Sequence, residues 1–389
     1  MEVGIANLRV AFDARMVHYR RAGIGQYSVS LLRAMSRLTE LGAGARVQVL
    51  QMRGHREHIV RDRRFRRVPM WTPPHNRFEQ PALGLELLKL RPRPQIIHSP
   101  DFVPPRYRTM RAVANIQDLA FLRFPDLTLL TDESKRYYSQ VHRAAHDADA
   151  LIALSNSARD DIVSLLGVEP VKVAVIPGAA GEQFKPPADF RQAQEIAARA
   201  FGLPTDGRGY IFFVGTIEPR KNLPTLLEAY RKLLDGKRVS PVPALVIAGR
   251  EGWLFEQVHA KIDALQLREQ VYLPGGVDDA ALVSLYQGAL AFVMPSLYEG
   301  FGLPVLEAMQ CGVPVVSSNA GSLAEVAGDA AILVDPRDVD GWAAGLERVL
   351  LDQEEAARLV ERGLRQARRF SWERAARETW ALYERVVGG

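Results

Sequence analysis

The sequence predicts an α/β protein that consists of two doubly wound domains facing each other across a cleft. Three observations lead to this prediction. Short apolar runs recur along the chain, several are followed by a turn and an amphipathic segment, and an irregular stretch rich in proline and charge divides the series. Such alternation is typical of a parallel sheet with helices on both faces, and 389 residues suffice for about two domains.

The first domain is expected over residues 1–177. It opens with an apolar strand, NLRVAFDA, a glycine turn, RRAGIGQ, an amphipathic helix, YSVSLLRAMSRLTEL, and a second strand, RVQVLQM. Further short apolar strands are expected at PQIIHSP, AVANIQDLAF, ADALIALS and VKVAVIPG. This order predicts a Rossmann-like arrangement in which ligands bind at the carboxyl ends of the strands.

The second domain is expected over residues 178–370, after the stretch PGAAGEQFKPPADFRQ at 177–192, which is typical of a linker. Strands are predicted at RGYIFFVGTIEP, PALVIAG, VYLPG, ALAFVMP and PVVSS, and a helix at NLPTLLEAYRKLL. The amphipathic segment SWERAARETWALYERVV predicts one more helix. We expect this helix, within residues 371–389, to return to the first domain.

The composition restricts the class of protein. The formal charge of +5 and the isoelectric point near 9.3 indicate an affinity for anions. Cys311 is the single cysteine, which excludes a disulfide within the chain and a thiolate metal cluster. The longest apolar runs fall well short of the ~20 residues that a bilayer requires, so a cytoplasmic protein is expected. Seven arginines lie between Arg53 and Arg67, where they form either a solvated surface or a peripheral contact with an anionic membrane.

A glycine-rich turn follows the first predicted strand. Gly23 and Gly25 match the first two glycines of G-x-G-x-x-G, but Ser28 stands at the third position and the second strand ends without an acidic residue. A nicotinamide cofactor is therefore not expected. The segment is either an ordinary tight turn or a place where the backbone approaches a ligand phosphate at a helix N-terminus.

A loop of the second domain carries two adjacent cations. In VGTIEPRKN, Arg220 and Lys221 follow a buried strand and precede a helix. A planar guanidinium beside a compact ammonium group suits a diphosphate. As a dipeptide alone, the pair fits solvated surface charge equally well.

The stretch PSLYEGFGLPVLEAMQCGVPVV, residues 295–316, combines a glycine-bracketed turn with two glutamates. Glu299 lies in the predicted loop, and Pro304 starts a short helix that places Glu307 one turn inside. Both carboxylates can then face one ligand. At the start of this helix, the backbone amides of Phe301, Gly302 and Leu303 can donate hydrogen bonds to phosphate and sugar oxygens. The alternative is a pair of solvent-exposed carboxylates near a helix start.

Together, the motifs E-G-F-G-L-P-x-L-E-A-M-x-x-G-x-P-V, VGTIEPRKNL, GDAAILVDPRD and FSWERAARETWALYERV resemble the group 1 family of retaining glycosyltransferases with the GT-B fold, including its mannosyltransferase-like members. The resemblance covers nearly the whole chain. It implies transfer of a hexose from a nucleotide sugar, of the GDP-mannose or UDP-glucose type, to a glycan, lipid-linked or small-molecule acceptor. The donor would bind mainly to the second domain and the acceptor mainly to the first.

The resemblance also implies roles for individual residues. Glu299 would hold hydroxyls of the donor sugar, and Glu307 would hold the ribose. Arg220 and Lys221 would bind the diphosphate, over which Gly25 would let the first-domain loop close. Sugar and phosphate would contact the amides of Phe301, Gly302 and Leu303. Neither a metal nor a cofactor is expected, since cations and helix N-termini can neutralise the leaving group.

Retention of configuration needs either two successive displacements or departure and attack on one face of the sugar, and the resemblance favours the second, in which the acceptor attacks the face from which the diphosphate leaves. Glu299 would then act through position and charge rather than as a nucleophile. The other two residues to which the resemblance gives a catalytic role are Gln117 and Asp118. Many relatives carry histidine where Gln117 stands. Gln117 can substitute if that histidine acts through its backbone carbonyl, but not if its imidazole takes part in the reaction. Thr216 stands where some members have arginine, which leaves the diphosphate to the neighbouring cations.

Two other classes of protein stay open on the sequence alone. A sugar-nucleotide epimerase or a glycan phosphorylase can share the fold, although a phosphorylase would need a pyridoxal-binding lysine and none lies in a recognisable setting. A non-catalytic protein that binds nucleotides or nucleic acid would also explain the arginines, and its binding would depend steeply on salt. We prefer the transferase hypothesis, with no nucleic acid as a partner.

Overall fold

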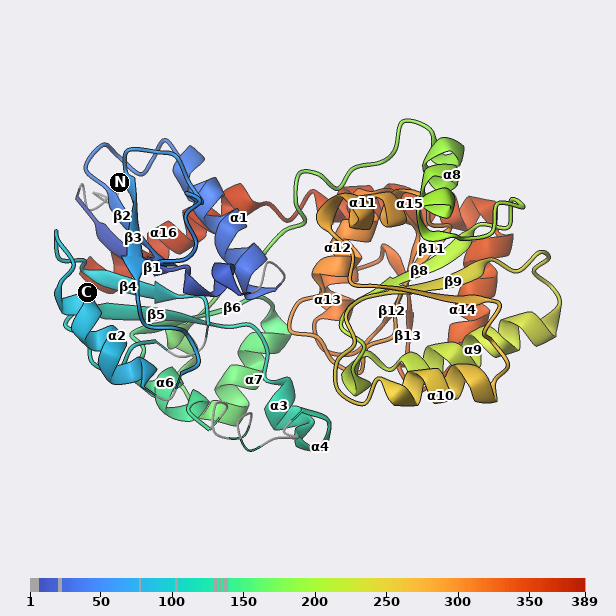
Figure 1. The fold of residues 1–389 in the computed structure, drawn as a ribbon, viewed down its shortest axis with the longest axis horizontal. Helices are drawn as coiled ribbons and strands as arrows, with labels where there is room; N and C mark the ends of the chain where they lie inside the picture. The colour runs from blue at the N-terminus through green and yellow to red at the C-terminus, as the bar shows by residue number, and fades with distance from the viewer. Residues whose placement is uncertain are drawn as a thin grey trace. The chain divides into compact units, whose positions relative to one another are not determined.

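The structure is a computed structural model, and it describes residues 7–19, 23–76, 78–101, 104–128, 132, 135 and 139–388. The chain divides into two compact units. Unit 1 comprises Met1–Gly178 and Ser371–Gly389, and unit 2 comprises Ala179–Phe370. Each unit contains a parallel sheet with helices packed against it, which confirms the predicted class of two parallel α/β domains (Figure 1).

Unit 1 contains a seven-stranded parallel sheet in the order β3-β2-β1-β4-β5-β6-β7. Its strands are β1 (Arg9–Asp13), β2 (Arg46–Met52), β3 (Phe65–Met70), β4 (Ile96–Ser99), β5 (Arg111–Ile116), β6 (Ala150–Ala153) and β7 (Val173–Val175). Its helices are η1 (Arg15–His18), α1 (Ile24–Arg37), α2 (Glu79–Leu88), α3 (Ala120–Arg123), α4 (Pro125–Thr128), α6 (Val141–Asp147), α7 (Asn156–Leu166), η2 (Pro170–Lys172) and α16 (Trp372–Gly388).

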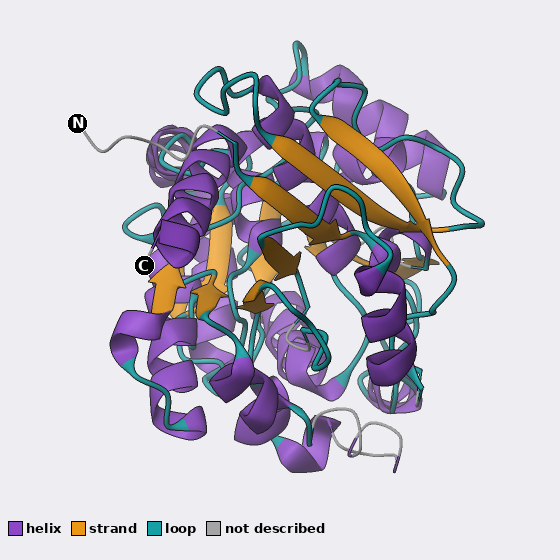
Figure 2. Cartoon of the chain, turned by 90° about the vertical axis from the view of Figure 1, so that its left-hand side faces the viewer, coloured by secondary structure: helices purple, strands orange, loops and turns teal. Residues whose placement is uncertain are grey.

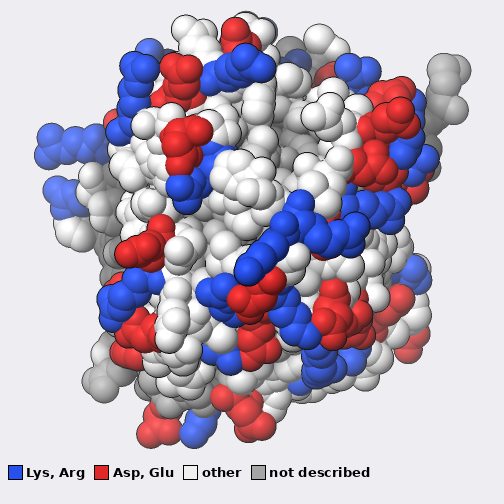
Figure 3. All heavy atoms as spheres, turned by 90° about the vertical axis from the view of Figure 1, so that its right-hand side faces the viewer, with Lys and Arg blue, Asp and Glu red and all other residues white. Residues whose placement is uncertain are grey.

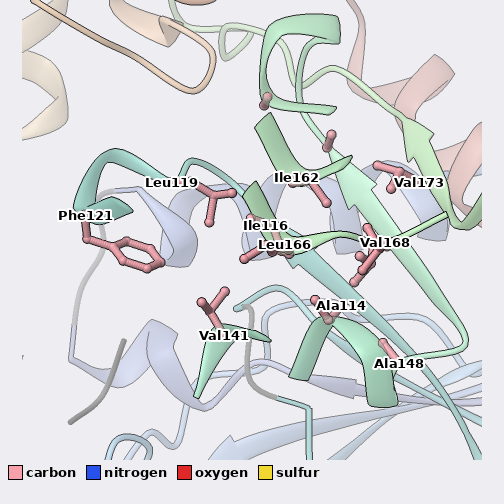
Figure 4. Close-up of a cluster of buried hydrophobic side chains, with 14 residues drawn as sticks. Ala114, Ile116, Leu119, Phe121, Val141, Ala148, Ile162, Leu166, Val168 and Val173 are labelled. Carbon is pink, nitrogen blue, oxygen red and sulfur yellow. The ribbon is translucent and has the colours of Figure 1, made fainter. Parts of the chain in front are cut away.

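The side chains of β5 alternate between two layers of helices, as the two-residue period of a strand requires. Ala112, Ala114 and Ile116 point to one face. Ala112 joins a buried apolar cluster with α2, and Ala114 and Ile116 join another with α6 and α7 (Figure 4). Asn115 points to the opposite face, which α16 covers. Figure 2 shows the strands of this unit with helices on both sides.

The last helix, α16, belongs to unit 1. In Figure 1 it is the red helix among the blue elements of that unit, and it packs along α1. Its Tyr383 hydroxyl hydrogen-bonds to Nδ1 of His98 in β4, and Nε2 of His98 lies 2.6 Å from Oδ1 of Asn115. Because an amide oxygen accepts, Nε2 carries the proton and Nδ1 accepts from the tyrosine. A fully buried, neutral histidine therefore ties the end of the chain to the first sheet.

Unit 2 contains a six-stranded parallel sheet in the order β10-β9-β8-β11-β12-β13. Its strands are β8 (Tyr210–Val214), β9 (Ala244–Ala248), β10 (Val271–Gly275), β11 (Ala291–Met294), β12 (Val315–Ser318) and β13 (Ala331–Val334). Its helices are α8 (Phe190–Phe201), η3 (Pro219–Lys221), α9 (Leu223–Gly236), α10 (Glu256–Ala264), α11 (Asp279–Gln287), α12 (Leu303–Gln310), α13 (Leu323–Ala327), α14 (Val339–Leu351) and α15 (Gln353–Ala367).

Two strands were not anticipated from the sequence. β13 was not recognised in GDAAILVDPRD, and β3 forms an edge of the first sheet inside the arginine-rich stretch. Some of those arginines hold the surrounding backbone. Arg64 lies 2.9 Å from Asp62 and donates to the carbonyl of Leu38 at 3.0 Å, and Arg67 donates to the carbonyl of His55 at 2.7 Å. A membrane contact through this stretch stays a proposal.

Within the described ranges, none of the helices combines the length and the apolar character that crossing a membrane would require.

The buried histidine predicts that the attachment of α16 depends on pH. Burial lowers the pKa of His98 to about 4, below its ordinary value, so at intermediate pH the unfolded chain binds a proton that the folded chain does not. Stability should therefore fall by about 2 kcal/mol between pH 7 and pH 5. Hydrogen exchange of the α16 amides measures this loss.

His98→Gln should flatten that pH dependence, whereas His259→Gln, at an exposed histidine of unit 2, should leave it unchanged. A pH dependence that persists in His98→Gln would contradict the assignment.

Candidate functional site

The candidate residues of unit 2 lie beyond the carboxyl ends of two neighbouring strands. β8 pairs with β11 in the centre of the sheet. After β8 the chain continues into η3, and after β11 it enters the loop that precedes α12. The two loops are joined directly, because the N–H of Leu297 donates to the carbonyl of Arg220 at 2.9 Å. The fold thereby places Arg220 beside Glu299, 79 positions away in the sequence.

Glu299 forms a buried ion-pair cluster with both cations that the sequence singles out. Its Oε1 lies 2.6 Å from Nζ of Lys221, and its Oε2 lies 2.9 Å from Nη1 of Arg220. Arg220 also lies 2.8 Å from Glu218 and donates to the carbonyl of Tyr298 at 2.8 Å. Glu299 and Lys221 are each only 8% exposed. We call Glu218, Arg220, Lys221 and Glu299 the charge cluster.

Burial and charge act in opposite directions on Glu299. Burial, the largest influence, raises the pKa of its carboxyl group, but Arg220 and Lys221 outweigh burial and lower the pKa to about 2. The carboxylate is therefore ionised throughout the neutral range. Because each of its oxygens accepts a hydrogen bond from a cation, the carboxylate has a fixed orientation and is a poor proton acceptor.

Glycines fix the backbone that carries Glu299. Gly302 has a φ of 103°, and a Cβ there would lie 2.7 Å from a leucine side chain. Gly321 has a φ of 59°, and a Cβ there would lie 2.9 Å from the carbonyl oxygen of Glu299. The Ser322 hydroxyl lies 2.8 Å from the carbonyl oxygens of both Glu299 and Phe301. Larger residues at either glycine would move the carboxylate.

The first turn of α12 has backbone N–H groups that are not bonded within the helix. Phe301 and Gly302 lead into it, and no side chain caps it. Pro304 has no N–H, and the N–H of Val305 donates to the carbonyl of Gly302 at 3.0 Å. The N–H of Leu303 has no acceptor within the helix, as in every first turn. With the positive end of the helix dipole, this turn suits an anionic or hydroxyl oxygen.

Glu307 lies one turn inside α12 and is half-buried. The Tyr286 hydroxyl, from α11, donates to its Oε2 at 2.9 Å. Burial raises the pKa of Glu307 to about 7; the hydrogen bond from Tyr286 opposes this shift, and Asp279 adds to it. Near neutral pH, Glu307 is therefore partly protonated while Glu299 is ionised.

In the glycine turn of unit 1, the residue that needs a glycine backbone conformation is Gly23. Gly23 is the N-cap of α1, with φ 59° and ψ −120°, a region that residues with a Cβ rarely occupy. Gly25 is buried inside the first turn of α1, where the absence of a side chain permits a close approach to the backbone. The role predicted for Gly25 stays a prediction, and residues 20–22 of this turn lie outside the described residues.

Gln117 and Asp118 follow β5 directly, at the carboxyl edge of the first sheet. Oδ1 of Asp118 accepts from the N–H of Ala120 at 3.0 Å and so holds the start of α3. Nε2 of Gln117 is buried, and the described residues offer it no hydrogen-bond partner, which is costly unless a ligand or water supplies one. Their position suits ligand binding, and their catalytic roles stay predictions.

A second set of charged residues, not identified from the sequence, lies at the carboxyl ends of β1 and β4. Nη2 of Arg15 lies 2.7 Å from both Asp13 and Glu79, and Nε2 of His75 lies 2.6 Å from Asp101. All five residues line one small pocket. This cluster was only weakly indicated by the sequence. FDAR lies at the end of the first strand, but nothing in the sequence indicates that the segments around positions 75 and 101 lie beside that strand end.

Two family profiles match the chain. Residues 195–366 match the glycosyl transferases group 1, and residues 21–180 match the Glycosyltransferase Family 4. O-antigen chain mannosyltransferase B of Escherichia coli is 30% identical in an alignment of 402 positions. The alignment covers 97% of this chain and 100% of that protein. The chain belongs to the group 1 glycosyltransferases, the family that its motifs resemble.

Other relatives match in part, and solved structures match in fold. The D-inositol 3-phosphate glycosyltransferase of Corynebacterium urealyticum is 32% identical over 64% of this chain and 59% of its own. Sucrose-phosphate synthase from Thermosynechococcus elongatus superposes with a TM-score of 0.77 at 20% identity, covering 98% of this chain and 100% of that one. HepE of Anabaena, solved with UDP and glucose, gives 0.74 at 15% identity, covering 97% and 99%. These structures confirm the GT-B fold.

Neutralising Glu299 should destabilise unit 2, and removing one cation as well should restore part of the loss. Glu299→Gln leaves Lys221 buried without its carboxylate partner and next to Arg220, which keeps Glu218, and breaking a buried pair in this way costs about 3 kcal/mol. Glu299→Gln combined with Lys221→Met removes one of those charges and should be more stable than the single variant. Denaturant unfolding followed by tryptophan fluorescence measures both. A double variant that loses the sum of the two single losses would contradict the coupling.

Proposed function

We propose that this protein is a retaining hexosyltransferase that moves mannose, or alternatively glucose, from a nucleoside-diphosphate sugar to a glycan, lipid-linked or small-molecule acceptor. The observation that carries the proposal is the buried charge cluster at the carboxyl edge of the second sheet. Family membership supports the transferase class, and the name of the Escherichia coli relative favours a mannosyl donor such as GDP-mannose. A donor of the UDP-glucose type is the second candidate, since HepE was solved with UDP and glucose.

In the proposed complex, Lys221 is the principal contact of the diphosphate. An ammonium group has three N–H donors, and Glu299 takes one of them at 2.6 Å. The Arg220 guanidinium is more fully engaged, because it bonds Glu218, Glu299 and the carbonyl of Tyr298. Lys221 can therefore bind phosphate while it still orients the carboxylate. Arg220 would mainly fix the geometry of the cluster, with the amides at the start of α12 completing the anion site.

Glu299 would hold hydroxyl groups of the transferred sugar. A carboxylate has about four acceptor positions, and the cations occupy only some of them, so sugar hydroxyls can use the others. Because the charge is fixed before the substrate arrives, it favours the positive charge that develops on the sugar as the diphosphate departs. Its low pKa and its paired oxygens argue against a nucleophilic role. The departing diphosphate would then take the proton of the acceptor hydroxyl, whose oxygen bonds to the anomeric carbon on the face that the diphosphate leaves, so that the configuration is preserved.

The acceptor would bind to unit 1, at the carboxyl edge of its sheet. Gln117 and Asp118 lie at this edge, as does the pocket lined by His75 and Asp101. The buried, unpaired amide nitrogen of Gln117 is a donor that an acceptor hydroxyl can satisfy. The side chain of Asp118 is held by the start of α3, so we assign it a positioning role.

We further propose that the reaction needs no divalent metal and no cofactor. Within the described residues, histidines, cysteines, aspartates and glutamates do not gather in groups of three or more that would suit a metal ion. The cations of the charge cluster and the start of α12 would supply the positive charge that a metal provides elsewhere. An assay with a panel of nucleotide sugars tests this proposal. We expect sugar release or transfer in the presence of EDTA, with GDP-mannose as the preferred donor.

A strict requirement for magnesium or manganese would overturn the metal-independent mechanism. Conversion of the donor sugar without an acceptor, into an isomer, would favour the epimerase alternative. Failure of every nucleoside diphosphate to stabilise the protein against heat would argue for a different class of ligand.

The two glutamates should respond differently to neutralisation. If Glu307 accepts from ribose hydroxyls, the ligand favours its ionised form, and affinity for the nucleoside diphosphate should fall as pH drops below about 7. The loss approaches tenfold for each pH unit below the pKa. Calorimetry at pH 8 and pH 6 measures this loss of affinity. Glu307→Gln is the control, because in this variant the phosphate of the ligand still titrates but the carboxyl group is absent.

Glu299→Gln should instead lower kcat by more than it weakens binding of the free nucleoside diphosphate, because Glu299 would contact the transferred sugar. A pH dependence that is equal in wild type and Glu307→Gln would remove Glu307 from the site. A larger kcat effect at Glu307 than at Glu299 would reverse the two roles.

A further inference from the structure

A wide hollow lies in unit 1 at the edge opposite Gln117 and Asp118. Its volume is about 910 Å³. Its walls come from the amino ends of β1, β4, β5 and β6, because Arg9 and Arg111 begin their strands and Gln95 and Asp149 immediately precede theirs. The strands are parallel, so their length separates this hollow from the carboxyl edge; six residues of β5 span roughly 20 Å. We call it the amino-edge hollow.

The amino-edge hollow carries an excess of positive charge. It is lined by five arginines and two aspartates. Asp149 is engaged by Arg111 at 2.8 Å and by the N–H of Ala112 at 2.7 Å. Arg108 donates to the carbonyls of Pro105 and Asp147. Three guanidinium groups have no carboxylate partner among the described residues, namely those of Arg9, Arg93 and Arg106.

Hydrogen bonds hold the segment that presents Arg93. Nε2 of Gln48, a buried residue, donates to the carbonyl of Pro92 at 2.5 Å. Nε of Arg9 donates to the carbonyl of Arg93 at 2.8 Å, and the N–H of Arg9 donates to the side chain of Gln95 at 3.0 Å. The positive charge therefore sits on a fixed loop beside the sheet rather than on a mobile surface chain.

The charge pattern of unit 2 is different. Figure 3 shows one face of the molecule on which Lys and Arg alternate with Asp and Glu. Many arginines of unit 2 pair with carboxylates, for example Arg231 with Asp235 and Arg238 with Glu347, each at 2.5 Å, whereas Arg191, Arg250 and Arg337 have no carboxylate partner among the described residues. What distinguishes the amino-edge hollow is that three arginines without a carboxylate partner among the described residues line one surface.

An exposed aromatic side chain, that of Tyr107, lies in the chain between two arginines that line the amino-edge hollow. The guanidinium of Arg106 lies over the ring of Tyr107, which is 57% exposed. The same segment packs against α2, where Tyr107 lies beside Gly84, and α2 exposes Leu85 and Leu88 to solvent. Arginine next to exposed aromatic and aliphatic side chains suits the boundary between lipid headgroups and acyl chains.

We infer that the amino-edge hollow is a second anion site that binds phosphate groups and takes no part in the transfer reaction. Arg9, Arg93 and Arg106 supply planar, multidentate donors, which match phosphate oxygens. The phosphate is carried either by a lipid headgroup or by a soluble phosphorylated molecule. The neighbouring apolar side chains favour the lipid. If the phosphate belongs to a lipid, the amino-edge hollow would contact an anionic membrane separately from the stretch from Arg53 to Arg67.

The test uses two probes and two matched variants of the full chain. Inorganic pyrophosphate represents the soluble ligand; its binding is measured by calorimetry in a Lys221→Met background, so that the diphosphate site proposed in unit 2 does not contribute. Flotation with vesicles of phosphatidylcholine, with and without phosphatidylglycerol, represents the lipid. Arg93→Gln with Arg106→Gln alters the hollow. Arg231→Gln with Arg238→Gln removes the same charge from unit 2.

We expect the Arg93/Arg106 variant to lose about tenfold or more in binding to phosphatidylglycerol vesicles, and the Arg231/Arg238 variant to bind as the wild type does. Pyrophosphate binding that is lost in the same variant, without vesicle binding, would assign the site to a soluble phosphorylated ligand. Vesicle binding without pyrophosphate binding would assign it to lipid headgroups. Binding of neither probe, or an equal loss in both variants, would overturn the inference.

Discussion

The site of unit 2 depends on one interaction, the contact of the buried Glu299 carboxylate with both Arg220 and Lys221. Each of its oxygens is within 2.9 Å of a cation. Burial of such a cluster is costly in free energy, and apolar residues of similar volume would commonly stabilise a fold as well or better. Its presence at the carboxyl edge of a parallel sheet, where this class of fold binds ligands, is therefore better explained by function than by stability.

The surrounding structure serves to hold this interaction. Adjacent, parallel β8 and β11 bring the two loops together, and Leu297 joins them through the carbonyl of Arg220. Gly302 and Gly321 allow the backbone turns that aim the carboxylate, and Ser322 fixes the carbonyl groups on either side. The consequence is a carboxylate that is charged and oriented before any ligand binds. The half-buried Glu307, on the helix that follows, behaves differently, because it pairs with no cation of the described residues and burial raises its pKa to about 7.

The sequence was sufficient to predict the fold and the loops of unit 2, because both follow from local patterns: apolar strands, glycine turns and a proline at a helix start. It also singled out Arg220, Lys221 and Glu299, which the structure brings together and whose roles stay predictions. It did not indicate that Glu299 pairs with the very cations assigned to the diphosphate, since that contact depends on which strands are neighbours. The cluster of Arg15, Asp13 and Glu79 and the amino-edge hollow were missed for the same reason. β3 was hidden because an edge strand rich in arginine lacks a clear apolar alternation.

The most direct test of the central claim is a crystal structure with a nucleoside diphosphate, in which the surroundings of Lys221 decide the outcome. The account predicts a phosphate oxygen at hydrogen-bonding distance from Nζ of Lys221, about 3 Å, while Glu299 still accepts from both cations and presents its free acceptor positions to the sugar. A diphosphate bound elsewhere, with the charge cluster unchanged and remote from it, would contradict the account.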